Sequence, residues 1–167
     1  MNKFHLTNKK NFSERDICSK YITPAILKSG WDLQTQVREE VTFTKGRIII
    51  KGKLHSRGAK KRADYVLYYK SNIPIAVIEA KDNKHSIGSG IQQALNYSES
   101  LNVPFVFSSN GDGFLFHDKT VLNTDVEKFL DLESFPSPDV LWNKYCKWKS
   151  FNNEFESNLI ETPYYSD

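Results

Sequence analysis

The clearest pattern of hydrophobic and polar positions along the chain lies between residues 62 and 97. Two short runs rich in Val, Ile and Tyr, residues 65–69 and 73–78, are separated by the polar pair Ser71 and Asn72. Apolar runs of this length and composition, split by a short turn, predict a β-hairpin.

This hairpin would bring charged side chains together at its open end. If Ser71 and Asn72 form a two-residue loop, Asp64 lies opposite Glu79, and directly opposed Cβ atoms are about 5 Å apart. Side chains alternate along a strand, so Lys81 lies on the same face as Glu79. A change of register by one residue would separate these groups. The pattern therefore predicts two carboxylates and an ammonium group in one place.

A helix is predicted before the hairpin. Ser13 resembles an N-cap, and Asp16 takes the Glu or Gln position of a capping box. The helix would run towards Ser29 and end at Gly30, while Pro24 either kinks it or begins a second short helix. Glu14 would point inward at the edge of an apolar stripe, which contains Cys18, Tyr21, Ile22 and Ala25.

The remaining elements follow from the same patterns. Val37, Glu39, Val41 and Phe43 alternate along a strand within residues 33–43, and residues 47–51 form a second strand, so with the hairpin they suggest an antiparallel meander. Residues 86–101 are predicted to be helical, and residues 103–108 form a strand that completes a β-α-β unit. A turn at 110–113 leads to a strand at 114–117, and Ser137 and Pro138 open a last helix with Leu141, Tyr145 and Trp148 on its apolar face.

Composition and charge limit the function classes. The 167 residues suffice for one domain with a sizeable core, and no apolar run approaches the roughly 20 residues of a membrane span. Two distant cysteines form no zinc pattern and suggest a reducing cytoplasm. Between Lys45 and Arg62 there are 8 Lys/Arg and no acid, although the net charge is only +3. This basic block is either a solvated loop or a surface for a polyanion such as nucleic acid.

The charged group at the hairpin suits one chemistry. Two close carboxylates repel each other, and a hard cation removes the conflict. Mg²⁺ is usually held by one or two protein carboxylates, several waters and a substrate phosphate. Lys81 could orient or deprotonate a water, or stabilise charge that develops at phosphorus. The residue types therefore indicate hydrolysis of a phosphodiester.

Asp64, followed by Glu79-Ala80-Lys81 on the next strand, resembles the PD-(D/E)xK nuclease superfamily. Gln93 and Tyr97 resemble the Q-xxx-Y motif of one of its branches. The wider match, from about Ser13 to Trp148, is similar to the N-terminal domain of the restriction (motor) subunit of type I restriction enzymes. It includes the segments G-W-D at 30–32, R-A-D-Y-V-L at 62–67 and P-F-V-F-S-S-N-G at 104–111. One departure is Ala63, which stands where the motif has proline.

The resemblance implies a restriction-endonuclease-like α/β core, with a central mixed sheet flanked by helices, over residues 1–149. Residues 150–167 would be a linker towards an absent ATP-dependent translocase domain. The implied activity is Mg²⁺-dependent cleavage of double-stranded DNA in the cytoplasm, in a complex with methyltransferase and specificity subunits. The catalytic candidates are Asp64, Glu79, Lys81, Gln93 and Tyr97, and the metal candidates are Asp64, Glu79, the Ala80 carbonyl and Glu14. The candidates for DNA contacts are Arg57, Lys60, Lys61, Arg62 and Lys84.

Alternatives remain open at this stage. Glu14 either reaches the metal, as a first-helix acid does in similar nucleases, or only stabilises the helix dipole. Gln93 and Tyr97 either line the site or are an exposed Gln beside a packed Tyr. The whole domain could be a catalytically silent module that binds DNA or docks partner subunits. A carboxylate-pair glycosidase is a third possibility, but it has no use for Lys81 or the basic block.

Overall fold

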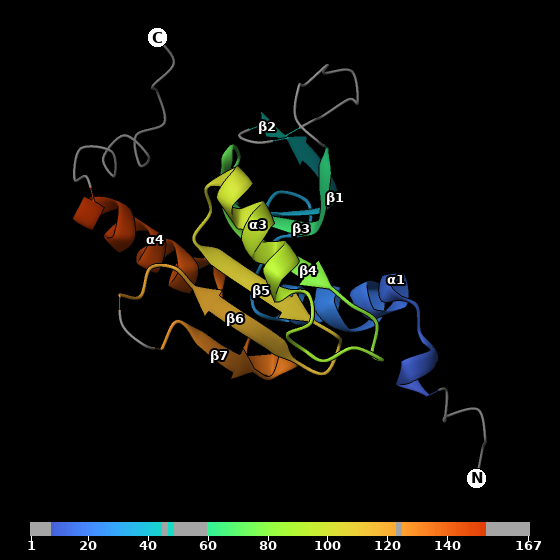
Figure 1. Cartoon of the computed structure of the whole chain (residues 1–167). Coiled ribbons are helices and arrows are strands. Elements are labelled where there is room, and N and C mark those ends of the chain that lie inside the picture. Colours follow the sequence, from blue (N-terminus) through green and yellow to red (C-terminus); the bar gives the residue numbers. More distant parts are fainter. Residues whose placement is uncertain (1–7, 45–46, 49–59, 123–124, 153–167) are drawn as a thin grey trace.

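The structure, a computed structural model, describes residues 8–44, 47–48, 60–122 and 125–152. Within these ranges seven strands form one mixed sheet, in which the order is β2-β1-β3-β4-β5-β6-β7 (Figure 1). The strands are β1 (Val37–Thr44), β2 (Arg47–Ile48), β3 (Lys61–Lys70), β4 (Ile73–Ala80), β5 (Phe105–Ser109), β6 (Phe114–Asp118) and β7 (Glu127–Leu130). Strands β4 and β5 are parallel, and the other neighbouring pairs are antiparallel. This confirms the predicted α/β fold with a central mixed sheet.

Helices cover both faces of the sheet (Figure 1). They are η2 (Lys9–Asn11), α1 (Glu14–Ile17), the π-helical turn η3 (Cys18–Ile22), α2 (Thr23–Lys28), α3 (Ile91–Leu101), η4 (Leu132–Ser134) and α4 (Pro138–Asn152). Ile17, Ile26 and Leu141 place α1, α2 and α4 in one core with the first sheet face. Ala94 and Tyr97 place α3 in a second core on the opposite face. The burial of both faces explains why the central strands are nearly continuous apolar runs.

The first helical segment begins as predicted and is interrupted in the middle. Ser13 Oγ accepts a hydrogen bond from the backbone N–H of Asp16 at 3.1 Å, and Asp16 Oδ2 accepts one from Ser13 N–H at 3.2 Å, which completes a capping box. Pro24 lies in the first turn of α2, where its missing N–H costs little. The π-helical turn η3 joins the two α-helical pieces, so Pro24 belongs to a second short helix. Gly30, with φ of +104°, follows its end.

The hairpin of β3 and β4 has the predicted loop. Lys70 pairs with Ile73 across Ser71 and Asn72, and Asn72 takes the left-handed conformation that such a turn requires, with φ of +75°. The register shifts on both sides of the pair of Tyr68 with Pro74. These two irregularities cancel, and Tyr65 pairs with Ile78 as the sequence predicts.

Several predicted details are wrong. The first strands are not a simple meander, because β1 lies between β2 and β3 in the sheet. Helix α3 begins at Ile91 instead of residue 86, since residues 87–90 form a turn. Strand β7 is not predicted at all: its side chains are mostly exposed and show no alternation. Helix α4 continues to Asn152, and residues 153–167 of the predicted linker lie outside the described part, so the division of the chain at residue 150 stays a prediction.

The predicted alternation along β1 also fails at one point. Glu39 and Glu40 are both exposed, and Glu40 has a φ of +53°. Val37 packs in the first core, whereas Val41 and Phe43 pack in the second. In a regular strand these three residues would share one face. The backbone at Glu40 therefore turns the strand from one face of the sheet to the other.

Candidate active site

Asp64 and Glu79 meet where β3 and β4 separate. The regular pairing of these strands ends at Tyr65 and Ile78. Beyond it, Asp64 Oδ2 accepts a hydrogen bond from the backbone N–H of Ala80 at 2.8 Å. Glu79 Oε2 in turn accepts a longer one, 3.5 Å, from the backbone N–H of Asp64. The two carboxylates thus continue the connection between the strands with side-chain oxygens.

Burial makes this pair electrostatically unfavourable when both groups are charged. Only 4% of Glu79 is exposed, and burial together with the neighbouring charge of Asp64 raises the pKa of Glu79 to about 8. Burial also raises the pKa of Asp64, although the Ala80 N–H opposes that shift. Near neutral pH the pair therefore holds a proton that a bound cation would displace.

Lys81, Gln93 and Tyr97 form a chain of hydrogen bonds beside the pair. The ammonium of Lys81 donates to Gln93 Oε1 at 3.3 Å, and Gln93 Nε2 donates to the Tyr97 hydroxyl at 2.5 Å. Tyr97 is buried and packs edge-on against Phe43, with ring centroids 5.3 Å apart. The structure therefore brings together the two residues of α3 and the lysine that follows β4. Gln93 is half-buried and engaged at both ends of its amide, in contrast to the alternative of an exposed Gln beside a packed Tyr.

The glycine-containing turn before α3 packs directly against Glu79. Gly90 N–H donates to Ser108 Oγ at 3.0 Å, and a Cβ atom on Gly90 would lie 3.2 Å from Glu79 Cγ. A Cβ atom on Gly88 would lie only 2.8 Å from Leu115 Cδ2. These close contacts show that both glycines let the turn pack against the sheet.

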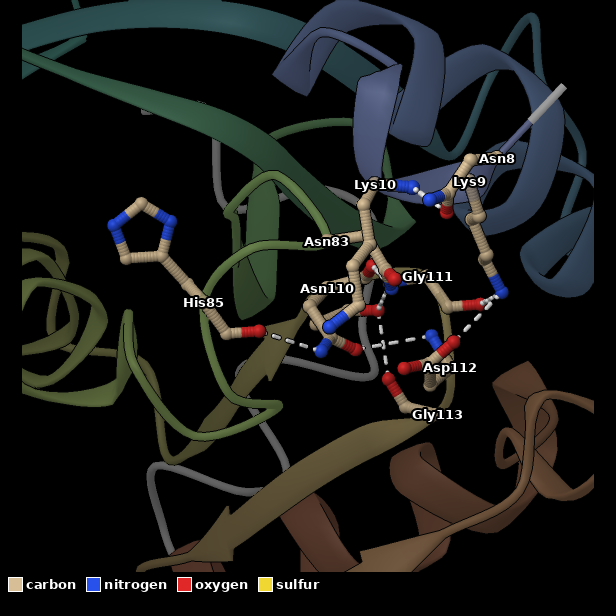
Figure 2. Close-up of polar contacts among 10 residues, drawn as sticks. Asn8, Lys9, Lys10, Asn83, His85, Asn110, Gly111, Asp112 and Gly113 are labelled. Atoms are coloured by element: carbon tan, nitrogen blue, oxygen red, sulfur yellow. Dashed lines mark hydrogen bonds and ion pairs between the residues drawn. The ribbon is translucent and has the colours of Figure 1, made fainter.

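The loop after Lys81 is fastened to the turn between β5 and β6 (Figure 2). Asn83 Nδ2 donates to the backbone oxygen of Asn110 at 2.9 Å, and Asn110 Nδ2 donates to the backbone oxygen of His85 at 2.7 Å. On the other side of the turn, Lys9 Nζ donates to the Gly111 oxygen at 2.6 Å. The predicted turn at 110–113 thus connects the N-terminal segment with the loop after Lys81 through hydrogen bonds.

Glu14 lies near the carboxylate pair. The sequence predicts that its side chain points inward, but Glu14 is exposed. Ile17, which is not part of the predicted apolar stripe, is buried instead. Partial desolvation and the charge of Asp64 raise the pKa of Glu14, which shows that the two acids interact. A pocket of about 250 Å³ connects them, and it is lined by Glu14, Arg15, Cys18, Glu39, Glu40, Asp64 and Tyr65.

The donor set fits a cation held by two protein ligands. Among the described residues no group of three or more His, Cys, Asp or Glu side chains is close enough to hold a metal ion. Glu14 therefore does not form a three-ligand set with Asp64 and Glu79 in this structure, and its role as a metal ligand stays a prediction. The buried Glu79 and the half-buried Asp64, both with raised pKa values, are nevertheless suited to Mg²⁺, which completes its coordination with water and phosphate oxygens. The role of the Ala80 carbonyl stays a prediction.

The five predicted DNA-contacting residues have different surroundings. Arg57 lies outside the described residues, while Lys60 and Lys84 are exposed. Lys61 belongs to β3 rather than to a loop, and its Nζ donates to Ser100 Oγ at 3.1 Å. Arg62 is exposed but forms an ion pair with Glu40 at 2.6 Å. Of the four that the structure describes, Lys61 and Arg62 therefore have protein partners.

Comparison with known proteins identifies the family. The model of the family "Type I restriction enzyme R protein N terminus" matches residues 33–136. The chain belongs to this family. Over 161 residues it is 48% identical to the type I restriction enzyme EcoAI endonuclease subunit of Escherichia coli, and the match covers 96% of this chain and 20% of that subunit. The chain thus spans about a fifth of the length of this curated relative.

A solved member of the family has the same fold. It is a fragment assigned to an HsdR subunit of a type I restriction enzyme from Vibrio vulnificus YJ016, with a TM-score of 0.68 and 40% sequence identity. The match covers 83% of this chain and 26% of that one. The family match includes the segment from Asp64 to Tyr97, whereas Glu14 and Arg15 lie before it. None of the helices in the described part of the chain combines the length and hydrophobicity needed to cross a membrane.

Proposed function

We propose that this chain is the endonuclease domain of a type I restriction enzyme R subunit and hydrolyses phosphodiester bonds of double-stranded DNA with the help of Mg²⁺. The observation that carries this proposal is the pair of half-buried Asp64 and buried Glu79 with the Lys81 ammonium beside it. A purely structural core would gain stability by replacing such a pair with apolar residues. The name of the EcoAI relative, an endonuclease subunit, supports the same activity.

Each residue has a distinct task in this proposal. Asp64 and Glu79 hold the cation, which would polarise the scissile phosphate and a bound water. Lys81 orients the attacking water or offsets charge that develops on the phosphate oxygens. Gln93 holds the Lys81 ammonium through its Oε1 atom, and Tyr97 fixes the Gln93 amide from the side of the core. Gln93 and Tyr97 are therefore positioning residues rather than groups that touch the phosphate.

The partners follow from the family. Exposed Lys60 and Lys84 would contact the DNA backbone, which positions a duplex without reading its sequence. The choice of sequence would belong to a specificity subunit and protection of host DNA to a methyltransferase subunit. ATP would be used only by a translocase domain outside this chain.

The first test is Mg²⁺ binding measured by calorimetry. The wild-type chain should bind Mg²⁺, and both Asp64→Ala and Asp64→Asn should lose this binding. Asp64→Asn keeps an acceptor for the Ala80 N–H, so its loss of binding cannot be blamed on a broken strand connection. Asp118→Asn is the control, because Asp118 is a buried carboxylate paired with Lys144 at the opposite end of the sheet.

The outcomes separate the proposal from its alternative. Loss of Mg²⁺ binding in the Asp64 variants alone, together with Mg²⁺-dependent nicking of supercoiled plasmid by the wild type, supports the endonuclease. Unchanged Mg²⁺ binding in the Asp64 variants contradicts it. Binding of duplex DNA without any Mg²⁺ site would favour a silent DNA-binding or docking module.

A further inference from the structure

Glu40 occupies an unusual position directly beside the carboxylate pair. In the ladder between β1 and β3, Glu39 pairs with Tyr65 and Val41 pairs with Ala63, so Glu40 lies opposite Asp64. The left-handed conformation of Glu40, with φ of +53°, is unfavourable for a residue other than glycine. A residue inside a strand normally avoids this conformation, so contacts at this position must favour both the left-handed backbone and the glutamate side chain.

The side chain of Glu40 holds two arginines. Its Oε1 atom forms ion pairs with Arg62, at an N···O distance of 2.6 Å, and with Arg15, at 3.3 Å. Arg15 comes from α1, directly after Glu14, and Arg62 comes from β3, two residues before Asp64. Arg15, Glu40 and Asp64 line the same pocket. Two of the three linked side chains therefore line the pocket that contains Asp64, and Arg62 is joined to them through Glu40.

This arrangement leaves both guanidinium groups available to a better acceptor. Their side chains are 65% and 60% exposed, and that of Glu40 is 48% exposed. Exposed ion pairs contribute little to stability, so they are readily exchanged. A single carboxylate oxygen shared by two arginines uses few of their ten N–H donors. A phosphate group offers more acceptor oxygens, and guanidinium groups bind it through two parallel hydrogen bonds.

We propose that Arg15 and Arg62 form a phosphate-binding pair for the DNA backbone beside the Asp64 pocket, and that Glu40 occupies this pair until a DNA phosphate replaces it. The inference rests on the proposed function, because it takes DNA as the polyanion. It adds Arg15 as a DNA contact and Glu40 as an internal competitor. DNA then reaches the carboxylates only after it has separated Glu40 from the two arginines.

The competition can be tested by DNA binding in the absence of metal. Glu40→Gln has nearly the same shape but no charge, so it should release both arginines and tighten the binding of a short duplex two- to tenfold, measured by fluorescence anisotropy in EDTA. Glu39→Gln is the matched control. It removes the same charge from the same pocket, but Glu39 accepts from the Thr23 hydroxyl rather than from arginine, so we expect a change below twofold.

A second background makes the test specific to the arginines. In the double variant Arg15→Ala/Arg62→Ala, Glu40→Gln should no longer tighten DNA binding, and the salt dependence of binding should be shallower than in the wild type. Glu40→Asn checks the fold, because Asn tolerates the left-handed conformation and should also release the arginines. Its thermal unfolding should show no loss of stability.

Several results would overturn the inference. Equal gains for Glu40→Gln and Glu39→Gln would show a general charge effect, and a gain that persists without the arginines would show that Glu40 does not act through them. Absence of duplex binding by all variants would also contradict it. Failure of the proposed function would appear as absence of Mg²⁺-dependent cleavage. This outcome is independent of the anisotropy experiment, which is done in EDTA and needs no cleavage.

Discussion

Asp64 Oδ2 accepts the backbone N–H of Ala80 at 2.8 Å, so a candidate metal ligand also serves as a hydrogen-bonding group of the sheet. The side chain takes over the role of a backbone carbonyl where β3 leaves β4. Its geometry is therefore fixed by the fold before any metal binds. The same arrangement places Asp64 against Glu79. A substitution of Asp64 can therefore change the stability of the protein in two ways, through the hydrogen bond to Ala80 and through the negative charge beside Glu79.

Substitutions of Asp64 should separate its structural and electrostatic effects. Asp64→Ala leaves the buried Ala80 N–H without its acceptor, and this should lower the free energy of unfolding by roughly 1–3 kcal/mol. Asp64→Asn keeps an acceptor oxygen and removes the negative charge that raises the pKa of Glu79. We expect Asp64→Asn to be at least as stable as the wild type at pH 8. Chemical denaturation of both variants measures this, and equal losses of stability would contradict the role of the Ala80 bond.

The stability of the metal-free protein should fall as the pH rises from about 4.5 to about 8. The pKa of Glu79 is raised from 4.5 to about 8 in the folded state, so between these values the folded protein holds a proton that the unfolded chain has released. Unfolding therefore becomes easier with increasing pH, by at most about 1.4 kcal/mol for each pH unit from this group. Asp64 and Glu14, whose pKa values are also raised, act in the same direction.

Glu79→Gln tests the source of this pH dependence. The amide cannot ionise, and its oxygen can still accept the Asp64 N–H, so the fall in stability between pH 5 and 8 should become smaller while the fold is retained. Urea denaturation at several pH values gives the comparison. An unchanged slope would show that Glu79 ionises normally and that the pair does not need a cation.

Lys81→Ala should abolish cleavage without loss of fold or DNA binding. The Lys81 ammonium is the cationic side chain that donates to Gln93 beside the carboxylates, and its removal takes away the group that would act on the water or the phosphate. Lys119→Ala is a matched control, since Lys119 Nζ also donates to a side chain of α3, Ser98, but on the other end of that helix. Plasmid nicking and duplex binding are measured together. If Lys119→Ala lost as much nicking, the effect of Lys81 would be structural.

Tyr97→Phe should impair cleavage more than stability. The ring would keep its edge-on contact with Phe43, but the hydroxyl that receives Gln93 Nε2 would be absent. Gln93 could then rotate and leave Lys81 without its partner, so the rate of cleavage should fall severalfold while DNA affinity stays within twofold. Gln93→Ala should have the same effect, and the double variant should be no worse than either single one, because the two residues act through one ammonium. Additive losses would show that each contacts the phosphate independently.

The predictable parts of this fold are those with strong local signals. The turn at Ser71 and Asn72 and the apolar runs beside it suffice to align Asp64 with Glu79, although this succeeds because two register shifts near Tyr68 cancel. The conformation of Glu40 could not be predicted, because no local sequence pattern indicates a left-handed glutamate. It depends on how β1 passes from one core to the other. Strand β7 has no alternation because both of its faces are largely exposed.

The turn at Asn110 was predicted as a hairpin loop, but its connection to the site could not be. The Asn110 side chain closes the turn by accepting the Asp112 N–H at 3.0 Å, and it reaches across to the His85 oxygen at 2.7 Å. The second contact joins segments 25 positions apart, which no local pattern encodes. It holds the loop that directly follows Lys81, so we infer that Asn110 positions Lys81.

Two substitutions separate these roles of Asn110. Asn110 is 4% exposed, and Asn110→Ala removes both of its side-chain hydrogen bonds. This substitution should lower the free energy of unfolding by roughly 1–3 kcal/mol. Asn110→Asp keeps the acceptor for Asp112 but has no donor for His85, so it should preserve the turn and loosen the loop. Both variants should cleave DNA more slowly with little change in duplex affinity, while Asn96→Ala, on an exposed position of α3, should change neither. If Asn110→Asp cleaves at the wild-type rate, the turn stabilises the fold but does not position Lys81.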